Sequence, residues 1–420
     1  MNRRYGKGFI FIALMLIPGY LFSQSSQWRG EKRTGHYPSG TLLDSWPENG
    51  PEMLLKNDQI GKGYSTPVME DDIIYITGKI DTMDHITALN LSGEILWQVP
   101  YGRSWKKSFP ESRSTPTIDG NNIYIISGQG ELACLNKKNG AIKWKQYVMK
   151  DYEGVYGSWG IAESPLVGDD HVYFTAAGPK TTLVAYNKES GELAWATESL
   201  DDTCAYASPI FINHNNQKMV VAVAANHIFG VDIESGQILW KYHYGNTGPP
   251  LKSKTSKNIN QNAPLYHDGL IYVTSGYNHV DLQLALRRTG TAVKQVWTDQ
   301  TLDVHLGGVV KVGDYIYGSN WINNRKGNWC CINWKTGETR YEQEWNNKGS
   351  IIYSDGLLYV YEEHRGHVGL IRPNPEKFDL IGSFRIQEGS GPHWAHPAIY
   401  EGKLLVRHGA VLMVYNIKQE

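Results

Sequence analysis

Short apolar stretches that run into the same polar phrase recur along the chain. Leu132–Trp144 (LACLNKKNGAIKW), Leu183–Trp195 (LVAYNKESGELAW) and Ile228–Trp240 (IFGVDIESGQILW) each contain an apolar strand, Asn or Asp, a polar stretch, Gly, three residues and Trp. Asn or Asp begins a tight turn, and Gly supplies its positive φ. Each phrase therefore predicts two antiparallel strands joined by a turn, with a Trp that packs between neighbouring units.

The phrase repeats with a period in the forties. Its closing aromatic residue recurs at intervals of 43 to 57 residues, as Trp97, Trp144, Trp195, Trp240, Trp297, Tyr341 and Phe384. An earlier hairpin such as His267–Val273 (HDGLIYV), with Asp-Gly between apolar residues, precedes the phrase. Four strands in each unit of this length are typical of β-propeller blades.

The starts of the units give the number of blades. Six starts carry a proline, which is tolerated at the first residue of a strand, and Gly307–Val312 and Gly349–Ser354 are the two other starts. The eighth unit ends near Glu420 after three strands, whereas Pro51–Lys56 (PEMLLK) precedes the first unit as a spare strand. We predict an all-β, eight-bladed propeller of four-stranded antiparallel blades, its ring closed by this N-terminal strand. Closure leaves few exposed sheet edges.

The first residues have the pattern of a secretory signal peptide. Arg3, Arg4 and Lys7 precede the apolar run Phe9–Ile17, which is shorter than the roughly 20 residues that a spanning helix needs. We predict a signal peptide over residues 1–24 and a single propeller domain over residues 25–420. The chain is then periplasmic or secreted, and it does not span the membrane.

Composition narrows the function. Lys and Arg number 41 and Asp and Glu number 42, so no basic excess points to a nucleic-acid partner. The 14 Trp, 26 Tyr and 44 Gly agree with many short strands and turns.

Two histidine pairs are candidate metal ligands. His364 with His367, and His393 with His396, are paired at a spacing of three, but neither pair lies on an expected helix. We predict no metal site from them.

The repeats resemble those of a known family. Ala88–Trp97, Cys134–Trp144 and Ala185–Trp195 resemble the pyrroloquinoline-quinone-like (PQQ-like) propeller repeat, and Gln27–Gly40 and Gly391–Gly409 resemble a group of exported bacterial proteins within it. The resemblance implies the propeller fold. The wider family includes quinoprotein alcohol dehydrogenases, polyvinyl-alcohol-dehydrogenase-like proteins and the outer-membrane β-barrel assembly lipoprotein. This chain has no C-x-x-C-H motif and no Cys near residue 24 for a lipid anchor.

Cys330 and Cys331 are adjacent, and some quinoprotein dehydrogenases cover their quinone with such a pair as a vicinal disulfide. Here the segment aligns with the Cys134 phrase, which places both residues within a strand. Neighbouring strand side chains point to opposite faces. We therefore expect two buried thiols.

The candidate site lies where residues just before each inner strand should surround the central channel. Long connections gather on the same face of the ring. The candidate ligand-binding residues are Tyr64, Arg113, Trp159, Glu163, Asn262, His305, Trp394 and His396, and Tyr206 and Lys348 occupy equivalent positions. Polar groups that converge among aromatic walls are typical of a small-molecule or peptide site.

Three functions follow from these observations. The first is a binding module, without an assigned cofactor or catalytic residue, that holds a small molecule, glycan or protein on this face as a monomer. The second is a PQQ-dependent alcohol or sugar oxidoreductase. There, by resemblance, Arg113 would pair with the carboxylates of PQQ, and Glu163 would hold calcium or act as a base. The third is a scaffold in envelope protein assembly.

Overall fold

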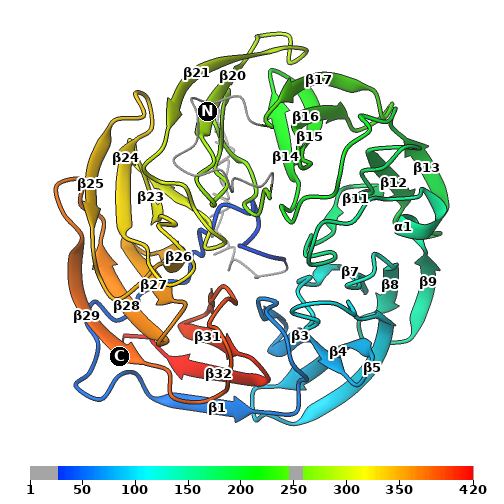
Figure 1. The fold of residues 1–420 in the computed structure, drawn as a ribbon. Helices are drawn as coiled ribbons and strands as arrows, with labels where there is room; N and C mark the ends of the chain where they lie inside the picture. The colour runs from blue at the N-terminus through cyan, green and yellow to red at the C-terminus, as the bar shows by residue number, and fades with distance from the viewer. Residues whose placement is uncertain (1–26, 246–258, 420) are drawn as a thin grey trace, which may run out of the picture.

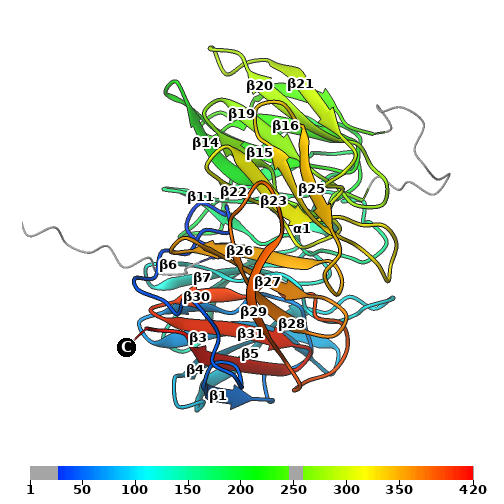
Figure 2. The same cartoon turned by 90° about the vertical axis from the view of Figure 1, so that its left-hand side faces the viewer.

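Eight four-stranded antiparallel sheets surround a central channel, as the sequence predicts. The computed structural model describes residues 27–245 and 259–419, so the predicted signal peptide lies outside the described residues. Figure 1 looks along the channel, and Figure 2 shows the same ring from the side. No helix within these two ranges is long and apolar enough to cross a membrane.

The first four blades follow one another in chain order. Blade 1 contains β2 Val68–Glu70, β3 Ile73–Ile80, β4 Met83–Asn90 and β5 Ile95–Arg103; blade 2 contains β6 Thr117–Asp119, β7 Asn122–Ile126, β8 Leu132–Asn136 and β9 Ile142–Gln146. A single helical turn, α1 Val148–Asp151, leads to blade 3. Blade 3 contains β10 Leu166–Val167, β11 His171–Thr175, β12 Leu183–Asn187 and β13 Leu193–Ala196; blade 4 contains β14 Ile210–His214, β15 Gln217–Val223, β16 His227–Asp232 and β17 Ile238–His243.

The remaining four blades complete the ring. Blade 5 contains β18 Leu265–His267, β19 Leu270–Val273, β20 Asp281–Leu286 and β21 Val293–Asp299; blade 6 contains β22 Val310–Val312, β23 Tyr315–Ser319, β24 Trp329–Asn333 and β25 Thr339–Gln343. Blade 7 contains β26 Gly349–Ser354, β27 Leu357–Glu362, β28 His367–Arg372 and β29 Asp379–Arg385; blade 8 contains β30 Ala398–Tyr400, β31 Lys403–His408, β32 Val411–Asn416 and β1 Met53–Asn57. The first strand named for each blade lies nearest the channel and the last named lies outermost, so β1 is the outer strand of blade 8.

The repeated phrase joins neighbouring blades at four places in the ring. Gly191 turns the β12–β13 hairpin at φ +74°, and a Cβ there would lie 2.6 Å from ring atoms of Trp144 in the preceding blade. The Trp144 indole N–H donates to the carbonyl of Lys188 in the same turn, at 3.0 Å. Three other turn glycines meet the preceding blade's Trp in the same way, namely Gly140, Gly236 and Gly337. The Trp therefore packs between blades, as predicted.

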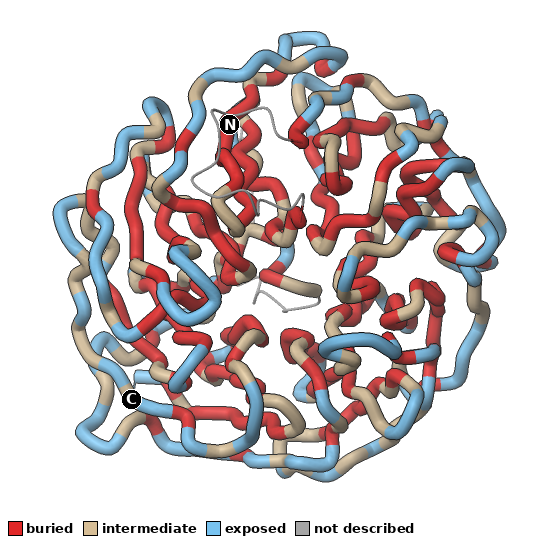
Figure 3. Tube along the Cα trace, in the orientation of Figure 1, coloured by how far each residue is buried: buried red, intermediate tan, exposed pale blue. Residues whose placement is uncertain are grey.

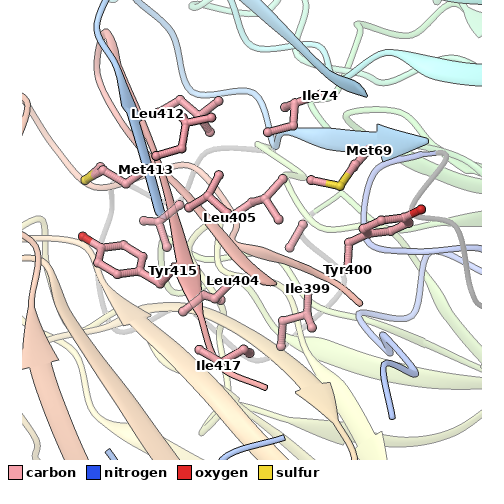
Figure 4. Close-up of a cluster of buried hydrophobic side chains, with 14 of the residues drawn as sticks. Met69, Ile74, Ile399, Tyr400, Leu404, Leu405, Leu412, Met413, Tyr415 and Ile417 are labelled. Atoms are coloured by element: carbon pink, nitrogen blue, oxygen red, sulfur yellow. The ribbon is translucent and has the colours of Figure 1, made fainter. Parts of the chain in front are cut away.

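The N-terminal strand closes the ring, which confirms the prediction made from Pro51–Lys56. β1 pairs antiparallel with β32, and Leu55 lies opposite Val414. Figure 1 shows the blue strand beside the red one. Figure 4 shows the core of blade 8, where side chains of β30 to β32 pack against Met69 and Ile74 of blade 1. This sheet pairs the first strand of the described chain with the last one.

A chain of hydroxyl groups joins the inner ends of the first four blades. The backbone N–H of Thr66 donates to Thr115 Oγ1, that of Thr115 to Ser164 Oγ, and that of Ser164 to Ser208 Oγ, each at 3.0 Å. Each of these residues precedes the proline that starts its blade. The Ser-Pro and Thr-Pro pairs thus satisfy backbone donors that would otherwise be buried without partners.

The segment 27–37, which we call the plug, crosses the centre of the ring and belongs to no blade. It is the dark blue segment at the centre of Figure 1. Arg29 donates to the carbonyls of Val309 and Ile351, in blades 6 and 7, at 2.6 and 3.1 Å. Arg33 donates to the carbonyls of Pro165 and Pro209, in blades 3 and 4, at 2.5 and 3.0 Å. The two arginines therefore hold opposite sides of the channel wall.

Burial separates the inner strands from the outer ones. All five residues of β7 are buried, whereas every residue of β9 is exposed or half-buried. Figure 3 shows this change from red near the channel to blue at the rim. On β24, Cys330 and Cys331 are free, buried thiols that belong to two different core clusters, as the alternation of a strand requires.

Candidate functional site

A cavity of about 350 Å³ lies in the channel, between the plug and the loops of one face. Six of the eight predicted residues line it, namely Tyr64, Arg113, Trp159, His305, Trp394 and His396. The wall also contains Trp28, Phe109, Thr115, Ala162, Ser164, Tyr206, Ser208, Gln261, Tyr277, Leu306, Asn324 and Glu363. The structure therefore brings most of the predicted site together.

Glu163 and Asn262 do not line this cavity, because their side chains form hydrogen bonds with backbone groups of the channel wall. Glu163 is buried, and its Oε1 accepts a hydrogen bond from the backbone N–H of Thr175 at 3.2 Å. Burial raises the pKa of Glu163 to about 8. Asn262 donates to the carbonyl of Val304 at 2.8 Å and accepts from the backbone N–H of Gly308 at 3.0 Å. Both side chains tie strands at the channel wall.

The aromatic side chains form two walls. On one side, Trp159 lies 5.5 Å from Tyr206 and stacks on Tyr277 at 6.3 Å between ring centroids. On the other side, Trp394 lies 5.1 Å from both Tyr64 and Phe109. These separations are those of favourable aromatic pairs. The rings hold one another in place and leave flat apolar faces along the cavity.

Arg113 stands between the two walls. Its guanidinium donates to the carbonyls of Trp159 and Phe109, one from each wall. Burial lowers the pKa of Arg113 from its usual range. These bonds join the two walls, so the side chain holds the loops together. The nearby Glu111 carboxylate offsets part of the positive charge of Arg113.

One ion pair lies in the wall below Tyr277. The Glu363 carboxylate accepts from Lys348 Nζ at 2.6 Å, and His305 Nδ1 lies 3.4 Å from its other oxygen. The second nitrogen of His305 is 3.0 Å from the Tyr277 hydroxyl. Burial alone would raise the pKa of Glu363, but the hydrogen bond to His305 and the charges of His305 and Lys348 lower it. The carboxylate is therefore ionised and paired.

The floor of the cavity comes from the plug. Trp28 packs against the edge of His396, with 5.5 Å between ring centroids. His396 Nδ1 accepts from Arg29 at 3.1 Å, and Nε2 donates to the carbonyl of Leu306 at 2.8 Å. Burial and the charge of Arg29 lower the pKa of His396 to about 3. His396 is consequently neutral, in one tautomer, at physiological pH.

Sequence reasoning did not select Trp28, Phe109, Tyr277, Gln261 or Glu363. Trp28 stands in the N-terminal segment quoted for the family resemblance, and Glu363 adjoins the His364 motif, so each had a local signal. Lys348, an equivalent rim position, pairs with Glu363 in the wall. Over residues 27–245 and 259–419, no group of three or more His, Cys, Asp or Glu is arranged to hold a metal ion. The arrangement is suited to holding a ligand with flat apolar faces and little charge.

Several curated proteins are similar to parts of this chain. Tetrathionate hydrolase of Acidithiobacillus ferrooxidans is 24% identical over 51% of this chain and 42% of its own length. Outer membrane protein assembly factor BamB of Yersinia pestis is 23% identical over 58% of this chain and 57% of its own length. The chain thus spans about half the length of these curated relatives.

Solved structures share the fold at low identity. BamB from Moraxella catarrhalis has a TM-score of 0.62 at 15% identity, covering 88% of this chain and 98% of that one. Quinohemoprotein alcohol dehydrogenase from Comamonas testosteroni has a TM-score of 0.65 at 11% identity, covering 95% of this chain and 81% of that one. These identities establish the architecture alone.

The repeats also match a family model, PQQ_2, over residues 82–325, which is more than half of the chain. That stretch contains the repeated Trp phrases of blades 1 to 5 and reaches β23 of blade 6. The match agrees with the eight-bladed ring and with both kinds of structural neighbour. The chain belongs to the family described as outer membrane protein assembly factor BamB.

Proposed function

We propose that this chain is an exported binding module that holds a small ligand in the aromatic cavity and acts as a monomer in the periplasm or outside the cell. The cavity itself supports the proposal most directly. Its volume, about 350 Å³, lies in the range of small-molecule sites, roughly 300–1,000 Å³. Aromatic rings make its walls, Glu363 is paired with Lys348, and Arg113 donates hydrogen bonds to two backbone carbonyls. Export rests on the basic and apolar pattern of residues 1–24.

A quinone-dependent oxidoreductase is the alternative suggested by part of the family. PQQ is a planar anion with several carboxylates, so the aromatic walls suit its shape. The described residues do not fit its charge. Both terminal nitrogens of Arg113 serve backbone carbonyls, and Glu363 is a paired anion. Glu163, the residue that would hold calcium or act as a base, does not line the cavity. We therefore derive no oxidation step.

A scaffold role in envelope protein assembly has one observation in its favour. Phe109, Val155 and Ile322 are each more than 40% exposed, and all three lie in connections on the face where the cavity opens. Large apolar side chains exposed on one face favour a protein contact. This role requires a partner that covers the rim rather than a ligand that fills the cavity.

Saturation-transfer NMR with a library of neutral, anionic and cationic fragments tests the proposal. The purified protein is compared with Trp159→Ala, which removes one wall, and with Leu193→Ala on the outer strand β13 as the matched control. Binding of neutral fragments that is lost only in Trp159→Ala supports a ligand cavity. If no fragment class binds in a Trp159-dependent manner, the ligand-binding proposal fails.

The two alternatives have their own readouts. Calorimetric titration with PQQ in calcium buffer should give no saturable heat, whereas submicromolar binding that is lost in Arg113→Ala would favour the oxidoreductase. A scaffold would lose its partner when Phe109 and Ile322 are replaced by Ser, while fragment binding would be absent in the wild type. Thermal melts of each variant verify that it is folded.

A further inference from the structure

The plug supplies the ring on which a ligand in the cavity would rest. Trp28 is half-buried and lines the cavity, although the rest of the wall comes from the blades and their connections. Its neighbour Arg29 lies 5.7 Å from the Trp28 ring and binds blades 6 and 7. Arg33 binds blades 3 and 4 on the far side. The floor is therefore fastened on both sides and presents an aromatic ring at a fixed place.

The charged groups around the cavity already have partners. Glu363 pairs with Lys348. Burial lowers the pKa of Arg113, and nearby negative charges, including that of the Glu111 carboxylate, oppose this shift. His396 is held neutral between Arg29 and the carbonyl of Leu306. A charged ligand would have to be desolvated to reach Glu363 or Arg113, each of which already has an opposite charge nearby, and such desolvation is costly in an enclosed site. The cavity therefore favours a neutral ligand.

Two acceptor groups in the wall could be satisfied by hydroxyl groups on a ligand. The Oε1 atom of Gln261 is buried and has no hydrogen-bond partner within residues 27–245 and 259–419. The Glu363 carboxylate, at the same wall, accepts hydrogen bonds as well. A purely apolar ligand would leave Gln261 Oε1 unsatisfied, at a cost of about 1–3 kcal/mol. Hydroxyl groups on the ligand would satisfy such acceptors.

A sugar ring combines these properties. It is uncharged, it carries several hydroxyl groups, and its C–H face matches the negative face of an aromatic ring. The cavity volume of about 350 Å³, at the lower end for small-molecule sites, suits one or two such rings. An aromatic ligand would stack equally well but offers fewer donors.

We infer that the cavity binds a neutral saccharide of one or two rings, with Trp28 of the plug as its stacking floor and Gln261 as a hydrogen-bond acceptor. The inference rests on the proposed ligand-binding function and gives it a ligand class. It also gives the plug a part in recognition in addition to its place in the fold.

A panel of saccharides tests this by calorimetry and saturation-transfer NMR. The probes are methyl glycosides of glucose, galactose, mannose and N-acetylglucosamine, with cellobiose and maltose, and with glucuronate and glucosamine as charged counterparts. At least one neutral probe should bind, and Trp28→Ala should weaken it at least tenfold. Trp28→Phe, which keeps a ring, should retain affinity within about threefold. Gln261→Leu removes the acceptor and should also weaken binding. Leu193→Ala, the control, should leave binding unchanged.

The outcomes separate this inference from the proposed function. If library fragments bind in a Trp159-dependent manner but no neutral saccharide does, the saccharide inference is overturned and the ligand-binding function stands. Tighter binding of glucuronate or glucosamine than of the neutral sugars also overturns it. If Trp159→Ala abolishes saccharide binding and Trp28→Ala leaves it unchanged, the role of the plug is overturned. If neither fragments nor saccharides bind, both proposals fail.

Discussion

Removal of the Arg29 guanidinium should release the plug from blades 6 and 7. Arg29 is 2% exposed, and it donates to the carbonyls of Val309 and Ile351 at 2.6 and 3.1 Å. It also donates to His396 Nδ1. Arg29→Met keeps much of the apolar stem but removes every donor, so the two carbonyls would be left buried without this partner.

The cost follows from the number of bonds lost. A hydrogen bond from a charged donor is worth about 1.5–3 kcal/mol, so the two carbonyl bonds together contribute about 3–6 kcal/mol. Burial of the guanidinium offsets part of this, and it lowers the pKa of Arg29 to about 10. We expect Arg29→Met to reduce the free energy of unfolding by about 2–4 kcal/mol after that offset.

Urea denaturation followed by tryptophan fluorescence measures this loss. Arg29→Lys is the matched control, because it keeps the charge but reaches fewer acceptors, and it should lie between wild type and Arg29→Met. Limited trypsin digestion gives a local readout, since cleavage after Lys32 or Arg33 should be faster in the variant. Equal stability of Arg29→Met and wild type, together with unchanged digestion, would refute the idea that Arg29 fastens the plug.

Three further predictions concern single residues. Gly191→Ala should destabilise the fold by about 2–4 kcal/mol in thermal melts, through its positive φ and the clash with Trp144, whereas Gly120→Ala, with open space at its Cβ, should cost only about 1 kcal/mol. The pKa of His396 is about 3 in the folded protein and about 6.5 in the unfolded chain, so the unfolded state binds its proton first as pH falls. Stability should therefore fall by at most about 5 kcal/mol as pH drops from 6.5 to 3. In acid denaturation, His396→Gln should reduce this pH dependence. The raised pKa of Glu163 gives the opposite pH dependence, because the unfolded carboxyl loses its proton above pH 4.5 while the folded one keeps it. Stability should therefore fall by at most about 4 kcal/mol as pH rises from 4.5 to 7.5. A Glu163→Gln variant that keeps the full wild-type slope would contradict this.

Much of the lining of the candidate cavity could be located from sequence, but not the contacts that its side chains make. The position just before each inner strand correctly placed Tyr64, Arg113 and His305 at the cavity. The same rule did not separate these from Glu163 and Asn262, whose side chains turn to the backbone instead. In this region the chain is irregular, so a side chain's direction depends on which buried donors and acceptors need a partner.

The sequence by itself determined the blades, because they are built from local signals. Gly191 and its equivalents supply turns, the Trp phrases supply the contacts between neighbouring blades, and the spare strand near Leu55 has a partner only in the incomplete last unit. The tertiary structure alone decided the plug. Arg29 and Arg33 lie in a segment without strand periodicity, and their acceptors are carbonyls that become neighbours only once the ring has closed. Local patterns specify turns and strands, whereas contacts between residues far apart in the chain depend on the assembled ring.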